Sequence, residues 1–232
     1  MRVRAYDQPV AYGGTVERLP GWTVVLPVKG LRGAKRRLGP EVGSWRMSLA
    51  GAFAEDVIDA ALGAVAVDRV LVVGGEGIGS ATLSLPGVTQ LTDVSGLDAA
   101  VTSGTSRARE AAPRCRILVL QTDLPCARPN DLDDLLTAAP GARPGVLADA
   151  EGLGTAALTM PAGTTLSTAF GAGSLARHVR AGAEPIESAV PRLRRDVDTV
   201  EHLREAVRLG VGPHTHRVLD QMRFTGVQEL TA

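Results

Sequence analysis

The chain has 232 residues, 44% of them hydrophobic, and its 25 basic residues balance its 25 acidic ones. A chain of this length can bury one substantial core. The even charge balance excludes a global basic field, so we expect neither nucleic acid nor a membrane as a partner. The segment Met1–Pro20 lacks the apolar stretch of a secretory signal, which predicts a cytoplasmic protein. Cys115 and Cys126 lack metal-ligand spacing and are expected to be reduced thiols.

The order of apolar and polar segments predicts one α/β domain at residues 21–220, after an extension at 1–20 and before a tail at 221–232. Its first strand is the β-branched run Trp22–Val28, which leads into a loop at Lys29. Later strands are expected at Arg69–Val73, Val88–Leu91, Ile117–Leu120 and Val146–Leu147, and helices at about Gly43–Leu62, Leu97–Ala111 and Asp131–Ala138. This alternation indicates βαβ units, and hence a three-layer α/β/α sandwich with a mostly parallel sheet.

Ligands of such open sheets bind beyond the carboxyl ends of the strands, so polar residues that follow strands are the first site candidates. The basic segment Lys29–Arg37 (KGLRGAKRR) directly follows the first strand. Its glycines would let backbone N–H groups approach an anion, and its cations would offset the charge. The segment fits a polyphosphate-binding loop, and it equally fits a solvated basic turn before the next helix. It lacks the spacing of a Walker A loop.

Two carboxylates are candidates for holding a metal ion. Asp123 follows the strand Ile117–Leu120, where a carboxylate on a rigid sheet suits a hard divalent cation; a turn-forming Asp is the alternative. Asp196 and Asp198 alternate on a segment predicted to be extended, so their side chains should point to opposite faces. Asp198, with Glu201 three residues later, fits the N-cap of a helix. Asp196 is therefore the better candidate for the second metal carboxylate.

A further group of candidates lies between these carboxylates in sequence. A glycine-rich turn ends at Thr155, before a short apolar strand, and Ser174 precedes a predicted helix. Ser174 could be an N-cap, and the same geometry would expose helix-terminal N–H groups to an anion. Arg177 and His178 either contact that anion or solvate the helix, and His178 is not predicted to be a catalytic base.

Together these segments resemble the guanylyltransferases of coenzyme F-420 biosynthesis, which act on 2-phospholactate, phosphoenolpyruvate or 3-phosphoglycerate. The resemblance covers most of the chain, and the branch that uses phosphoenolpyruvate is the most similar. It implies a nucleotidyltransferase fold of the nucleotide-diphospho-sugar transferase type. It rests on seven motifs in the order of the family: LPVKGLRGAKRRL (Leu26–Leu38), GLDAAV (Gly96–Val101), LVLQTDLP (Leu118–Pro125), GLGTAAL (Gly152–Leu158), FGAGSLARH (Phe170–His178), DVDT (Asp196–Thr199) and LGVGP (Leu209–Pro213).

The resemblance also implies roles for individual residues. Lys29, Gly30 and Lys35 would bind the GTP phosphates, with both lysines acting in catalysis, and Asp123 and Asp196 would hold Mg²⁺. Three further residues, Thr155, Gly171 and Ser174, would bind the three-carbon acid.

One position departs from the family pattern. Asp98 stands where the family usually has Asn, within the nucleotide-binding region. Its carboxylate could accept hydrogen bonds from guanine, or it could cap the helix that follows.

The implied reaction is in-line attack of the acid's phosphate on the α-phosphorus of GTP, with release of pyrophosphate. The product would then pass to the next enzyme of F-420 biosynthesis. Two other readings stay open. One is a related nucleotidyltransferase, of the molybdopterin guanylyltransferase or sugar-nucleotide synthase type, and the other is a non-catalytic GTP-binding regulator.

Overall fold

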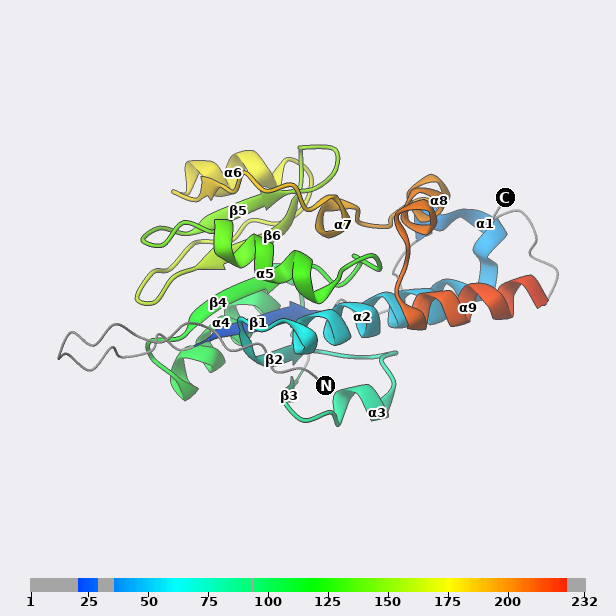
Figure 1. Cartoon of the computed structure of the whole chain (residues 1–232), viewed down its shortest axis with the longest axis horizontal. Helices are drawn as coiled ribbons and strands as arrows, with labels where there is room; N and C mark the ends of the chain where they lie inside the picture. Colours follow the sequence, from blue (N-terminus) through cyan, green and yellow to red (C-terminus); the bar gives the residue numbers. More distant parts are fainter. Residues whose placement is uncertain (1–20, 29–35, 93, 225–232) are drawn as a thin grey trace, which may run out of the picture.

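The protein folds around a seven-stranded sheet with helices on both faces (Figure 1). The structure, a computed structural model, describes residues 21–28, 36–92 and 94–224. The strands are β1 (Trp22–Pro27), β2 (Val67–Val73), β3 (Val88–Leu91), β4 (Arg116–Leu120), β5 (Gly145–Ala148), β6 (Thr155–Met160) and β7 (Glu184–Pro185). The longer helices are α2 (Arg46–Gly63), α4 (Leu97–Ala111), α5 (Pro129–Ala138), α8 (Val200–Leu209) and α9 (Pro213–Phe224). Shorter helices are α1 (Gly39–Val42), α3 (Ser80–Leu83), α6 (Ser174–Arg180) and α7 (Pro191–Arg194).

The strands are ordered β3-β2-β1-β4-β6-β5-β7. β1 is parallel to β2 and β4, β2 is parallel to β3, and β5 is parallel to β7. β6 alone among the described strands runs against its neighbours, β4 and β5. The described sheet is therefore mostly parallel, as expected from the sequence, and β6 makes it mixed. Because β6 is reversed, its first residue, Thr155, lies at the edge where β4 ends.

The core consists of two apolar layers, one on each face of the sheet. Val24 and Leu26 of β1 pack with α2 and α5 on one face, and Val25 packs with α4 on the other, as the alternation of a strand requires. Figure 1 shows α2 and α5 in front of the sheet and α4 behind it. Helix α4 approaches β1 so closely that a Cβ built on Gly104 would lie 2.4 Å from Val25 Cγ1. The three-layer sandwich predicted from the sequence is confirmed.

A third apolar cluster joins α8 and α9 to the amino-terminal half of α2. The start of α9 is held by Asp56 of α2, whose Oδ1 and Oδ2 accept hydrogen bonds from the backbone N–H groups of His214, at 2.9 Å, and Thr215, at 3.0 Å. Burial raises the pKa of Asp56 above its ordinary value, although these two hydrogen bonds favour the charged form. The buried carboxylate of Asp56 thus accepts the hydrogen bonds that water would otherwise accept from the first N–H groups of α9.

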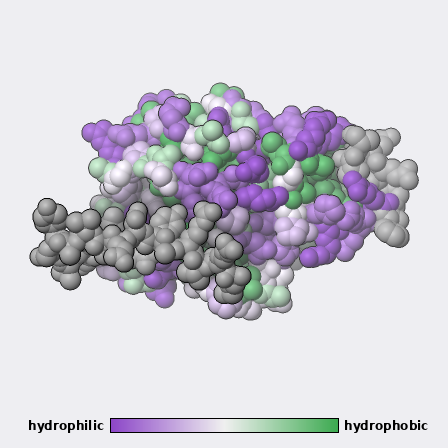
Figure 2. Space-filling view, viewed as in Figure 1, coloured by the Kyte–Doolittle hydropathy of each residue, from purple (hydrophilic) through white to green (hydrophobic). Residues whose placement is uncertain are grey.

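The expected strands and helices all occur, and β3 and α4 have the predicted bounds. Both cysteines are free, as expected, and both are buried. Within the described ranges, no helix is both long and apolar enough to cross a membrane. The face seen in Figure 2 is mainly hydrophilic, with smaller hydrophobic patches between the polar residues.

Candidate active site

The basic loop that follows β1 is only partly described. Lys29, Gly30 and Lys35 lie outside the described residues, so their roles toward GTP phosphates stay predictions. Val28, the last described residue before the loop, donates its N–H to the carbonyl oxygen of Val73 at 2.9 Å. Val28 therefore lies at the carboxyl ends of β1 and β2, the edge where ligands of open α/β sheets bind.

The segments that carry the two predicted metal carboxylates meet at this edge of the sheet. Val197 N–H donates a hydrogen bond to the carbonyl oxygen of Asp123 at 2.9 Å, and Ala150 N–H donates to that of Arg194 at 2.8 Å. The segment 194–197 therefore runs along the edge from the end of β5 to the end of β4. Asp196 lies between these two contacts, next to Asp123. One oxygen of each carboxylate, Oδ1, is shielded from solvent.

Asp149, which the sequence analysis did not single out, shapes the turn before β6. Its Oδ1 accepts from Leu153 N–H at 2.9 Å and its Oδ2 from Gly154 N–H at 2.8 Å. A Cβ on Gly154 would lie 2.2 Å from Asp149 Oδ2, so the turn requires glycine there. Asp placed a few residues before Gly-Leu-Gly is the signal that could have identified it, because Asp commonly bonds nearby backbone N–H groups in turns. The turn fixes the position of Thr155.

Thr155 and Ser174, two of the residues implied to bind the acid, lie in hydrogen-bond contact. Their side-chain oxygens are 3.0 Å apart, and Thr155 Oγ1 is also 2.9 Å from His178 Nδ1. Ser174 is 1% exposed and His178 is fully buried. Burial lowers the pKa of His178, and the nearby charge of Asp98 offsets this only in part. His178 is therefore a buried member of this network, a role that the sequence analysis did not foresee.

The loop that carries Gly171 is held by Arg177 from α6. The guanidinium donates to the carbonyl oxygens of Ala169 at 3.0 Å, Ala172 at 2.6 Å and Phe170 at 3.2 Å. Gly171 itself has φ 106°, which favours glycine. Arg177 thus orders this loop. The sequence analysis predicted that Arg177 either contacts the acid or solvates the helix, and did not predict this role.

Asp98 contacts the same loop from α4. Its Oδ1 accepts a hydrogen bond from Phe170 N–H at 3.1 Å, across 72 positions of sequence. It does not cap α4, whose N-cap residue is Gly96 with no side-chain hydrogen bond. The capping alternative for Asp98 is therefore wrong, and its predicted contact with guanine stays a prediction.

Two other capping interpretations are also corrected. Helix α8 begins after Thr199, whose hydroxyl accepts from His202 N–H at 3.2 Å, so Asp198 is not the N-cap. Helix α6 follows Gly173, in a left-handed conformation with φ 69°, so Ser174 is the first helical residue and not the cap. In both cases the cap lies one residue from the predicted position.

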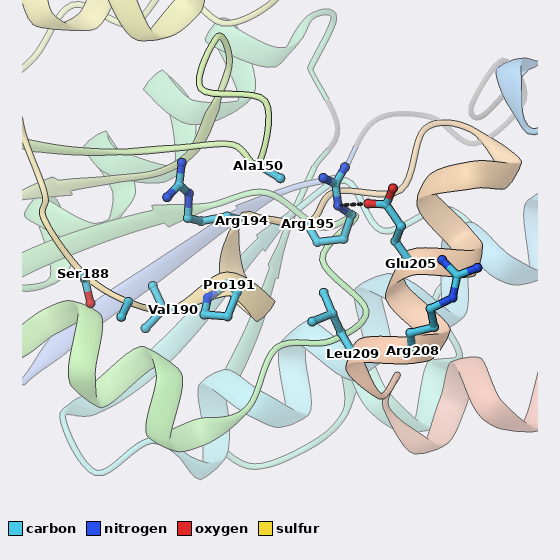
Figure 3. Close-up of a pocket in the computed structure, with 10 residues that line it drawn as sticks. Ala150, Ser188, Val190, Pro191, Arg194, Arg195, Glu205, Arg208 and Leu209 are labelled. Carbon is cyan, nitrogen blue, oxygen red and sulfur yellow. Dashed lines mark ion pairs between the residues drawn. The ribbon is translucent and has the colours of Figure 1, made fainter.

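A cavity of about 500 Å³ lies beside the segment 194–197 (Figure 3). It is lined by Ala150, Ser188, Ala189, Val190, Pro191, Arg194, Arg195, Glu205, Arg208 and Leu209, and so by none of the predicted site residues. Arg195 spans Glu151, at 2.6 Å, and Glu205, at 3.1 Å. Burial is the largest single effect and opposes the charge of Arg195. The hydrogen bond with Glu151 and the nearby carboxylate charges together outweigh it, so the pKa is raised. These ion pairs fix the segment that carries Asp196, and we do not assign the cavity to the reaction.

The donor set at Asp123 and Asp196 fits a hard divalent cation. Carboxylate oxygens are the ligands that Mg²⁺ prefers, and Mg²⁺ sites often consist of one or two carboxylates completed by substrate phosphates and water. Over the part of the chain that the structure describes, no cluster of three or more His, Cys, Asp or Glu residues suits a metal.

The fold defines the class of protein. It is similar to that of a Methanothermobacter nucleotidyl transferase, with a TM-score of 0.57, 19% identity, and coverage of 89% of this chain and 99% of that one. It is also similar to a protein from Desulfovibrio desulfuricans described as a nucleotide-diphospho-sugar transferase, with a TM-score of 0.61, 16% identity, and coverage of 91% and 98%. The chain has the nucleotidyltransferase fold.

The family model described as "Guanylyl transferase CofC like" matches residues 22–231, and the chain belongs to this family of enzymes. A phosphoenolpyruvate guanylyltransferase of Thermomonospora curvata is 41% identical over 204 residues, which cover 87% of this chain and 90% of that one. One of Streptomyces coelicolor is 41% identical over 209 residues, covering 88% and 99%. The resemblance to the F-420 guanylyltransferases is thereby confirmed. Enzymes of this class generally use a divalent metal ion.

Proposed function

We propose that the protein transfers GMP from GTP to the phosphate of phosphoenolpyruvate and releases pyrophosphate, as a step of coenzyme F-420 biosynthesis. The observation that carries the proposal is the hydrogen bond from Val197 N–H to the carbonyl oxygen of Asp123, 2.9 Å long. It joins the backbone segments that carry the two carboxylates, at the sheet edge where the Thr155 and Ser174 hydroxyls also lie. Two relatives at 41% identity are phosphoenolpyruvate guanylyltransferases, which supports phosphoenolpyruvate as the acid.

We assign Asp123 and Asp196 to Mg²⁺. When bound there, the ion would neutralise charge that develops on the phosphates during transfer. The two carboxylates leave most of its coordination positions to phosphate oxygens and water, which suits an ion that gives up water reluctantly.

In the proposed step, an oxygen of the acid's phosphate attacks the α-phosphorus of GTP. A new P–O–P bond forms, and the bond from the α-phosphorus to the oxygen that bridges to the β-phosphorus breaks. The electron pair of that bond leaves with pyrophosphate. A phosphate is already ionised near neutral pH, so the step needs no general base. This agrees with His178, whose two ring nitrogens already contact Thr155 and Ala169.

The protein's contribution is then mainly positioning and charge stabilisation. Lys29 and Lys35 are proposed to bind the GTP phosphates, together with the backbone at Gly30. The acid is proposed to lie against the Thr155–Ser174 pair and the backbone of Gly171.

Pyrophosphate release tests the proposal. The purified chain, GTP and Mg²⁺ are combined with phosphoenolpyruvate, 2-phospholactate or 3-phosphoglycerate in separate reactions, with ATP as the nucleotide control. We expect release that requires GTP and phosphoenolpyruvate together. Binding of GTP without release with any acid would instead identify a regulator. Release that requires a different acid would replace the substrate but keep the reaction.

We further propose that the product passes to the next enzyme of the F-420 pathway. Its phosphoanhydride is prone to hydrolysis, so direct transfer would protect it. Adding that enzyme and its acceptor to the assay should raise the yield of pyrophosphate. An unchanged yield would show that no transfer partner is needed.

A further inference from the structure

The imidazole of His178 has a different partner at each of its two nitrogens. Nε2 accepts a hydrogen bond from the backbone N–H of Ala169 at 3.0 Å, and Nδ1 lies 2.9 Å from Thr155 Oγ1. A backbone N–H can only donate, so Nε2 must offer a lone pair. A neutral ring with a lone pair on Nε2 carries its hydrogen on Nδ1. The contact with Thr155 is therefore an Nδ1–H donor meeting a hydroxyl oxygen.

This tautomer determines what the two hydroxyls can offer a ligand. The contact between His178 and Thr155 uses the imidazole hydrogen, and the 3.0 Å contact between Thr155 and Ser174 uses one hydroxyl hydrogen. Two hydroxyls carry two hydrogens, so one remains outside the network. With the hydrogen on Nε2 instead, Thr155 would donate to Nδ1 and Ser174 to Thr155. Both hydroxyl hydrogens would be used, and the pair would present only lone pairs, which repel an anion.

We propose that His178 is a positioning residue that fixes the Thr155–Ser174 pair as a hydrogen-bond donor to an anionic oxygen of the acid substrate. This inference rests on the proposed function, because the acid is placed at these hydroxyls. The inference explains why the Thr155–Ser174 pair would bind an anion in preference to a ligand that donates hydrogen bonds.

The surroundings of the ring keep it neutral. Burial lowers the pKa of His178, the carboxylate of Asp98 on α4 raises it, and the guanidinium of Arg177 on α6 lowers it again, with burial the largest of the three effects. The edge-on ring of Phe170, 5.0 Å away between ring centres, adds an apolar wall. A charged imidazole would place Nε2–H against Ala169 N–H, so protonation would break the contact with the loop.

Two substitutions separate the two contacts of the ring. The amide nitrogen of Asn can occupy the place of Nδ1, so His178→Asn keeps a donor toward Thr155. The amide group of Gln reaches the place of Nε2, so His178→Gln keeps a partner for Ala169 and loses the donor. We expect His178→Gln to raise KM for phosphoenolpyruvate about tenfold and His178→Asn to raise it less, while KM for GTP changes little in both. The exposed His216→Asn is the matched control and should leave both values unchanged.

A mutant cycle tests whether His178 acts through Thr155. In a Thr155→Val background, His178→Gln should produce no further rise in KM for the acid, because the hydroxyl that it orients is gone. Equal effects of His178→Gln in the two backgrounds would overturn the proposal.

A direct test does not depend on activity. The ring of His178 in the ¹⁵N-labelled wild-type protein, assigned by comparison with His178→Asn or with Thr155→Val, should show the Nδ1–H tautomer near neutral pH in long-range ¹H–¹⁵N correlation spectra. An Nε2–H tautomer or a charged ring would overturn the inference, even if neither His178 variant folds. If the wild-type protein shows this tautomer but releases no pyrophosphate with phosphoenolpyruvate, the proposed function fails separately.

Discussion

The backbone N–H of Val197 donates to the carbonyl oxygen of Asp123, 2.9 Å away, and so joins two segments that are more than seventy positions apart in sequence. The bond puts Asp196, the residue before Val197, beside the end of β4. Two carboxylates that the sequence presents separately thereby become one candidate metal site.

Replacing either carboxylate should abolish transfer without unfolding the protein. We expect Asp123→Asn and Asp196→Asn each to lower kcat/KM at least about hundredfold, because the charge that offsets Mg²⁺ is lost. Pyrophosphate release measures the effect, and thermal unfolding checks the fold. Asp134→Asn, an exposed change on α5, is the control, and Asp198→Asn tests whether the neighbouring carboxylate is dispensable. Full activity of the Asp196→Asn variant would show that Asp196 is not a metal ligand.

Substitutions of Asp98 can distinguish two roles of this residue: holding the loop at Phe170, or contacting guanine. Asp98→Asn keeps an oxygen that can accept from Phe170 N–H, whereas Asp98→Ala leaves that N–H without the acceptor seen at 3.1 Å. If the loop is what matters, Asp98→Ala should raise KM for the acid severalfold and Asp98→Asn should not. Steady-state kinetics with each substrate varied in turn measure this. A rise confined to KM for GTP in both variants would instead support contact with guanine.

The stability of the protein should fall as the pH is lowered below about 6.5 because of His178. The pKa of this histidine is lowered from its ordinary value of 6.5, chiefly by burial. Between 6.5 and the folded-state pKa, the unfolded chain binds a proton that the folded chain does not, so stability rises with pH across this window. The slope is at most about 1.4 kcal/mol per pH unit. Urea unfolding at several pH values measures it, and His178→Asn should flatten the curve in this window.

Neither cysteine should react with thiol reagents while the protein is folded. Cys115 is 1% exposed and Cys126 is 0% exposed. Burial raises the pKa of the Cys126 thiol to about 12, so the reactive thiolate is scarce. A colorimetric thiol assay should detect no reaction in native buffer and both thiols in urea. Rapid labelling of the native protein would contradict the burial of these side chains.

Asp56 should contribute strongly to stability through α9. Asp56→Ala leaves the N–H groups of His214 and Thr215 without their carboxylate, and we expect a loss of about 2 kcal/mol or more in the free energy of unfolding. Asp59→Ala, on the same helix, removes a partly exposed contact between Asp59 Oδ2 and His214 Nε2, 2.9 Å long, and should cost less than about 1 kcal/mol. Chemical denaturation of both variants measures the difference. Equal losses would show that the buried carboxylate is no more important to α9 than this surface contact.

The sequence by itself determined the class of fold and much of the candidate site. Strands and helices can be predicted from short stretches of sequence, because β-branched runs and the helical spacing of apolar residues involve only near neighbours. The bounds of β3 and α4 were predicted to the residue. Asp123 could be singled out because position after a buried strand is itself a local property. The capping residues were wrong by one or two positions, because caps depend on backbone angles that several neighbouring residues could adopt.

The tertiary structure decided which residues act together. The reversal of β6 is set by pairing with β4 and β5, and it is what carries Thr155 to the edge where β4 ends. The contacts of Asp98 with Phe170 and of His178 with Thr155 join segments whose separation in sequence carries no signal of proximity. His178 resembles a surface residue in a basic stretch of sequence, and only packing of α6 on the sheet buries it. Burial and partner geometry, which follow from the whole fold, give this histidine its single tautomer.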